Sequence, residues 1–135
     1  GPDRPDPELA ATLTALADLL LFRGRYADGQ PLIEEALRIR RAAHGALHPD
    51  VAESVGDLGV NLAQQGRVAE AAKYLREALE MQRRLHPGPH PDLAEALNNV
   101  GWALNSLNRP AEAEPLYREA LAMNRRLLGE AHPEI

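Results

Sequence analysis

Apolar residues recur every three or four positions over several stretches of the chain, the spacing that lines one face of an α-helix. Residues 93–104 carry the pattern at Leu93, Leu97, Val100 and Leu104. The same spacing returns in residues 13–20, 58–62, 71–85 and 113–127, and polar segments separate these stretches. The pattern predicts an all-α protein built from short amphipathic helices.

Signals for helix starts and stops fall between these stretches. A proline followed by Asp or Glu, as at 49–50 and 91–92, favours a helix start. Proline has no backbone N–H, but the N–H groups of the first helical turn have no partner inside the helix, so nothing is lost there. The carboxylate that follows interacts with the positive end of the helix dipole. Gly24, Gly66 and Asn108 are residue types that end helices in the left-handed conformation. Glycines at 45, 88 and 129 predict loops, and three arginine pairs precede them, Arg40-Arg41, Arg83-Arg84 and Arg125-Arg126.

The helix signals repeat with a fixed period. His-Pro-Asp at 48–50 returns at 90–92 and, as His-Pro-Glu, at 132–134, so each step is 42 residues. Residues 48–89 and 90–131 are identical at 19 of 42 positions. A degenerate copy, Asp-Pro-Glu, stands at 6–8. We therefore expect three units, 6–47, 48–89 and 90–131, and the start of a truncated fourth at 132–135.

Each unit holds two helices and a short turn, which cannot bury both apolar faces alone. Stacked units bury them together. The predicted fold is an all-α, right-handed α-solenoid of three helix-turn-helix hairpins, six helices in all, with the first helix of each hairpin on the inner surface.

In these features the chain resembles the tetratricopeptide repeat family, and in its long period it is similar to the kinesin-light-chain type. The segments HPDVAESVGDLGVNLAQQGRVAEAAKYLREALEMQRRL and HPDLAEALNNVGWALNSLNRPAEAEPLYREALAMNRRLLGEAHPE carry the resemblance, which covers about residues 6–134. The family's small residue in the first helix falls on Ala17, Gly59 and Gly101.

The resemblance implies a protein-interaction scaffold, not an enzyme, that binds a partner's peptide or helix along the concave surface. Asn99 matches the asparagine with which relatives clamp a peptide backbone, whereas the equivalent positions hold Asp57 and Ala15. Trp102 is the only tryptophan, and it is either a partner anchor or a packing residue. The candidate concave residues are Glu53, Asp57, Val60, Glu95, Asn98, Asn99, Trp102 and Ser106. With Asp18, the carboxylates among these residues make the predicted concave surface acidic, so we expect it to bind a basic or polar peptide.

Composition narrows the other functions. The formal net charge of −5 disfavours nucleic acid, which requires clustered positive charge, although the arginine pairs leave that alternative open. No membrane span or signal peptide is legible and cysteine is absent, so a cytoplasmic location is expected. Residues 1–5 look like a tag remnant or linker. A truncated last unit would expose apolar residues such as Leu121 and Leu127, so self-association is a second alternative.

No cofactor and no catalytic residues are expected, because no catalytic triad, phosphate-binding loop or paired catalytic carboxylates are legible. His48, His90 and His132 occupy equivalent positions one repeat apart and would not converge on one ion, so no metal site is expected. Their predicted role is at helix starts.

Overall fold

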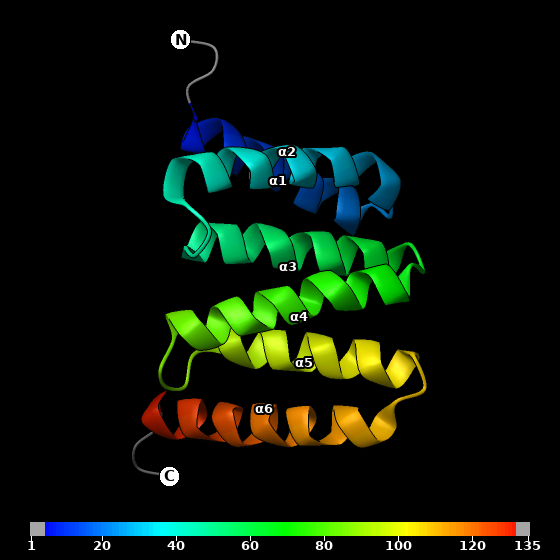
Figure 1. The fold of residues 1–135 in the computed structure, drawn as a ribbon, viewed down its shortest axis with the longest axis vertical. Coiled ribbons are helices and arrows are strands. Elements are labelled where there is room, and N and C mark those ends of the chain that lie inside the picture. The colour runs from blue at the N-terminus through cyan, green and yellow to red at the C-terminus, as the bar shows by residue number, and fades with distance from the viewer. Residues whose placement is uncertain (1–4, 132–135) are drawn as a thin grey trace.

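Six helices make up the protein in the computed structural model, which describes the backbone of residues 5–131 and the side chains of residues 5–129. The helices are α1 (Pro7–Phe22), α2 (Tyr26–His44), α3 (Pro49–Gln64), α4 (Val68–Leu85), α5 (Pro91–Ser106) and α6 (Pro110–Ala131). They stack along the long axis of the molecule, with the α1–α2 hairpin at one end and α6 at the other (Figure 1). The predicted all-α solenoid of six helices is confirmed.

Each helix packs mainly against its neighbours in the sequence, and α3 also touches α5. One continuous apolar core therefore runs through the stack, with Leu62 and Leu97 among its most deeply buried members. Within the described residues, no helix is long and apolar enough to cross a membrane.

The histidine of the repeated triplet begins the first helix of a hairpin. The Nδ1 atom of His48 accepts the backbone N–H of Asp50 at 3.1 Å, and His90 does the same for Asp92 at 3.0 Å. Asp6 caps α1 with its carboxylate. A side chain that accepts an N–H of the first turn satisfies a donor that has no partner inside the helix. The predicted role at helix starts is confirmed for His48 and His90, whereas His132 lies outside the described residues.

The turns inside the hairpins follow the expected chemistry. Gly24, Gly66 and Asn108 have φ angles of +77°, +83° and +62°, the left-handed conformation that ends a helix. The loop predicted at Gly129 is wrong, because α6 continues to Ala131. A glycine inside a helix costs only about 1 kcal/mol, too little by itself to end one.

The repeated small residue allows close helix packing. A Cβ atom added at Gly59 would lie 2.7 Å from Leu75 Cδ2, and one added at Gly101 would lie 3.1 Å from the ring of Tyr117. Leu75 and Tyr117 occupy equivalent positions of α4 and α6, 42 residues apart. In each of these two hairpins, the first helix therefore has a glycine at the point where a large side chain of the second helix packs against it.

The unit boundaries at 6–47, 48–89 and 90–131 remain a prediction, although the helices alternate in the expected order. The expected tag remnant at 1–5 and the fourth unit at 132–135 fall, apart from Pro5, outside the described residues.

Candidate functional site

A cavity of about 310 Å³ opens between α3, α4 and α5. Its lining is rich in hydrogen-bond acceptors: carboxylates come from α3 and α5, and the side of α4 adds an amide and apolar side chains. Among its lining residues are Glu53, Asp57, Glu95, Asn99, Leu75 and Gln82.

The repeat explains why these side chains meet. Glu53, Asp57 and Val60 are spaced by four and three residues, so they share one face of α3. Their equivalents 42 residues later are Glu95, Asn99 and Trp102 on α5, which share the corresponding face. Two parallel copies of one helix face thus line the same surface. Of the predicted residues, the structure brings these six together.

A smaller cavity of about 210 Å³ adjoins the first and shares Val60, Leu75 and Asn99 with it. Trp102 lines this second cavity with 44% of its surface exposed. Such exposure leaves a large part of the indole available for contact, whereas a tryptophan that only filled the core would be covered. Asn99 lies between the acidic cavity and the tryptophan.

The electrostatics centre on Asp57, which is half-buried on α3. The pKa of Asp57 is raised from 3.8 to about 7, chiefly because burial removes water from around the carboxylate. The neighbouring charges of Glu53, Asp18 and Glu95 contribute to this rise, whereas Arg40 opposes it. The cavity therefore concentrates negative charge that nearby cations of the chain offset only in part.

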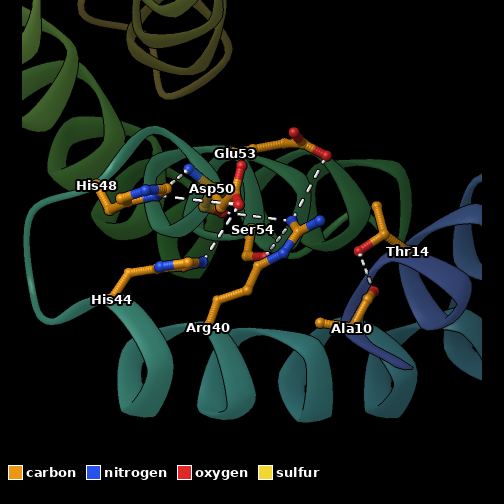
Figure 2. A network of polar contacts seen from close by, with 8 residues as sticks. All are labelled: Ala10, Thr14, Arg40, His44, His48, Asp50, Glu53 and Ser54. Atoms are coloured by element: carbon orange, nitrogen blue, oxygen red, sulfur yellow. Dashed lines mark hydrogen bonds and ion pairs between the residues drawn. The ribbon is translucent and has the colours of Figure 1, made fainter. Parts of the chain in front are cut away.

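Arg40 is buried and joins α2 to α3 (Figure 2). Its Nη1 atom donates to Ser54 Oγ at 3.0 Å and to the carbonyl of Asp50 at 3.3 Å, and it lies 3.5 Å from Glu53 Oε1. Arg40 is therefore not available to a basic surface for nucleic acid, because buried acceptors on the next hairpin hold its guanidinium inside the protein.

Two other members of the arginine pairs form ion pairs with glutamates of the next hairpin. Arg41 pairs with Glu77 at 3.2 Å, and Arg83 pairs with Glu119 at 2.8 Å. The two pairs are equivalent, 42 residues apart, and each connects the second helices of adjacent hairpins. These ion pairs offset the positive charge that nucleic-acid binding would need.

Gln82 of α4 adds an unpaired acceptor to the cavity wall. The residue is 8% exposed, and its Oε1 atom finds no hydrogen-bond donor among the described residues. A buried acceptor without a partner costs free energy, so a donor supplied by a ligand would be favoured there. The sequence offered no signal for Gln82, because its helix was interpreted only through its apolar positions.

Two predicted residues lie apart from this arrangement. Asn98 and Ser106 are exposed on α5, and neither lines the two cavities described above. Asn98 directly precedes Asn99 and so points from a different side of the helix. Ser106 lies at the last residue of α5, beyond Trp102.

Comparisons with known proteins agree with the fold. The family model described as tetratricopeptide repeat matches residues 8–84 and 57–126. A comparison with curated proteins gave no match. Among solved structures, the chain is similar to a protein from Podosopora anserina described as a kinesin light chain with nearly identical TPR-like repeats, with a TM-score of 0.83 and 21% identity over 96% of this chain and 61% of the other.

Two further structures share the fold. BtubC (BKLC) from P. vanneervenii has a TM-score of 0.85 and 21% identity over 93% of this chain and 50% of its own. The TPR domain of Arabidopsis FLU has a TM-score of 0.76 and 16% identity over 88% of this chain and 97% of its own. The chain thus spans about half to three fifths of the first two proteins. With the family model matching most of its length, the chain belongs to the tetratricopeptide repeat family.

Proposed function

We propose that the protein is an interaction module that binds a segment of a partner protein along the surface formed by α3 and α5. Tetratricopeptide repeats generally mediate protein–protein interaction. The observation that carries the proposal is the acceptor-rich cavity between α3, α4 and α5. This cavity is open to the surface, and the exposed indole of Trp102 stands beside it.

A basic or polar segment suits this surface best. Glu53, Asp57 and Glu95 offer carboxylates, and the Gln82 amide offers an unpaired oxygen. A lysine or arginine side chain carries several N–H donors and a positive charge, so it would satisfy these acceptors and relieve the repulsion among the carboxylates. An acidic segment would add to that repulsion.

Asn99 and Trp102 give the segment a backbone partner and an apolar anchor. The amide of Asn99 donates and accepts at once, as a peptide backbone requires. A partly exposed tryptophan is well suited as a binding hot spot, because it offers a large rigid surface. Asn98 and Ser106, which line neither cavity, have no contact assigned in this proposal.

The test is selection from a random peptide library displayed on phage, with the protein immobilised at pH 8 and at low salt. Peptides rich in Lys and Arg are expected to be enriched. Asn99→Ala combined with Trp102→Ala should weaken the binding of an enriched peptide by about tenfold or more, as expected for removal of a hot spot.

Asn124→Ala on the exposed surface of α6 is the matched control, and it should leave the affinity unchanged. Enrichment of acidic peptides, or equal affinity in the Asn99/Trp102 double variant, would contradict the proposed groove. The non-enzymatic role and the cytoplasmic location stay predictions from the sequence and the family.

Self-association is the second candidate, and the exposed apolar side chains of the two outer helices favour it. Phe22 of α1 is 91% exposed, and Leu121 of α6 is 50% exposed. Exposed apolar surface of this kind can pair between copies of the chain. Light scattering at high concentration should then give a mass above one chain, and Leu19→Glu with Phe22→Glu should lower it. A single-chain mass for the unaltered protein would exclude this candidate.

A further inference from the structure

Two clusters of histidine and aspartate side chains lie where one hairpin joins the next, and the aspartate of each also lines the cavity between α3, α4 and α5. In the loop between α2 and α3, His44 and His48 stack with ring centroids 3.8 Å apart and planes inclined by 8° (Figure 2). Asp50 completes the group: its Oδ2 atom lies 3.4 Å from His44 Nε2 and 3.9 Å from His48 Nδ1.

The same arrangement recurs one repeat later. His86 and His90 stack with centroids 3.6 Å apart and planes inclined by 12°, beside Asp92. In each cluster, one ligand atom from each of the three residues lies within 4.8 Å of the other two. Four of the five histidines of the chain therefore sit in two equivalent groups.

The first cluster contains a buried ring nitrogen without a hydrogen bond. His44 Nε2 makes no hydrogen bond among the described residues, and its contact with Asp50 Oδ2 at 3.4 Å is an ion-pair contact only. In the second cluster, burial and the neighbouring His90 lower the pKa of His86, whereas Asp92 raises it. Imidazole nitrogen and carboxylate oxygen together suit zinc, nickel and copper better than magnesium or calcium.

We propose that each cluster binds one divalent metal ion such as zinc. The ligands are His44, His48 and Asp50 in the first cluster and His86, His90 and Asp92 in the second. Convergence arises within each loop, between a residue at the end of one helix and two at the start of the next. The sequence suggested no metal site, because equivalent histidines lie one repeat apart. That distance does not matter for ligands that come together at a single junction between two helices.

The separations of the ligand atoms are close to those of a zinc site, and one ring of each stacked pair has to rotate, because an imidazole nitrogen binds a metal in the plane of its ring. Ligand atoms of a tetrahedral zinc ion, at bonds of about 2.0–2.2 Å, lie about 3.3 Å from one another. His44 Nε2 and Asp50 Oδ2 already have that separation, and His48 Nδ1 has to approach by about half an ångström. Three protein ligands leave the fourth position to water.

Metal binding at His48 has a structural consequence. Its Nδ1 atom accepts the N–H of Asp50 and so caps α3, and a bound ion would replace that hydrogen bond with a metal bond. The ion would then join the end of α2 to the start of α3 directly. Bound metal should therefore raise the melting temperature, because it binds only the folded arrangement.

Isothermal titration calorimetry of the full chain with zinc chloride tests the proposal. We expect two ions per chain, no measurable binding of magnesium, and a melting temperature that rises with zinc. His44→Ala or His86→Ala should leave one ion per chain, and the double variant should bind none. Circular dichroism of each variant without metal reports whether it is folded.

Two further variants keep the test decisive if a histidine variant fails to fold. Asp50→Asn with Asp92→Asn preserves the shape of the side chains and should weaken zinc binding by about tenfold or more. His132→Ala is the matched control, because the position four residues before it is Leu128, and it should keep two ions per chain. Absence of zinc binding by the unaltered chain, or two ions bound by the His44/His86 double variant, would overturn the proposal.

Discussion

Arg40 is the residue whose burial ties the first two hairpins together. Its guanidinium serves Ser54 Oγ and the carbonyl of Asp50, and both acceptors belong to α3. Removing the donor leaves these acceptors without a partner inside the protein, which costs more than the loss of an exposed ion pair.

Arg40→Met should therefore lower the free energy of unfolding by about 3 kcal/mol, measured by urea denaturation. Methionine keeps much of the apolar stem, so the loss reports chiefly on the polar contacts. Arg41→Met is the neighbouring control, and because its pair with Glu77 is exposed, it should cost less than about 1 kcal/mol. Equal losses in the two variants would show that the buried contacts of Arg40 do not stabilise the fold.

Asp57 makes stability depend on pH. Its pKa is about 7 in the folded protein and 3.8 for the unperturbed group, so the folded state holds this proton more tightly. The contribution of Asp57 to the free energy of unfolding consequently falls as pH rises from about 4 to about 7 and is level above that.

Asp57→Asn should stabilise the protein at pH 8, by at most about 4 kcal/mol at 1.36 kcal/mol per pKa unit, and should change little at pH 4. Urea denaturation at both pH values measures the difference. Glu80→Gln, at an exposed carboxylate of α4, should show no such pH dependence. An equal effect of Asp57→Asn at pH 4 and pH 8 would mean that ionisation of Asp57 does not oppose folding.

Among the elements, α3 shows how closely the helices approach. Gly59 faces α4 where an added methyl group would press against the side chain and backbone of Leu75, at 2.7 Å and 3.2 Å. Gly56 lies on the same helix, but its nearest neighbour would be Ala78 Cβ at an ordinary 3.8 Å. Substituting each glycine by alanine therefore distinguishes the effect of close packing, at Gly59, from the effect of helix propensity, at Gly56.

Gly59→Ala should lower the free energy of unfolding by about 1–3 kcal/mol, because the added methyl group forces α3 and α4 apart. Gly56→Ala should instead stabilise by up to about 1 kcal/mol, because alanine favours the helix. Thermal or urea unfolding of both variants checks the contrast. Stabilisation by Gly59→Ala would show that the contact with Leu75 yields easily.

The sequence predicted the elements well because their signals are local. The turn residues Gly24, Gly66 and Asn108 have the φ angles that their type favours, and the apolar spacing marked the helices. Gly129 misled because one glycine without a following turn signal does not end a helix. For the candidate site, helical spacing and the 42-residue period sufficed to group Glu53, Asp57 and their equivalents.

Residues whose role depends on packing between hairpins escaped prediction. Gln82 reaches the cavity wall, and Arg40 reaches Ser54, only because neighbouring hairpins stack at a particular distance. His44 meets His48 because the loop turns at Gly45, whose φ is +85°. None of these contacts follows from the spacing of residues along one helix.

On the scale of the whole molecule, stacking of nearly equivalent hairpins creates one repeated surface with unequal chemistry. The α3 copy is acidic at Glu53 and Asp57, whereas the α5 copy keeps Glu95 but adds the amide of Asn99 and the indole of Trp102. A peptide segment that lies across both helices would contact the carboxylates of α3 and, beside them, the apolar indole of Trp102 on α5. The central claim is that this surface binds a basic segment of a partner.

The most direct measurement is a titration followed by the fluorescence of Trp102, the single tryptophan of the chain. A lysine-rich peptide enriched by the library selection should change the emission saturably at pH 8, with an affinity that weakens as salt rises. Glu53→Gln, Asp57→Asn and Glu95→Gln together should abolish most of the binding. An unchanged affinity in this triple variant, or equal binding of an acidic peptide, would contradict the claim.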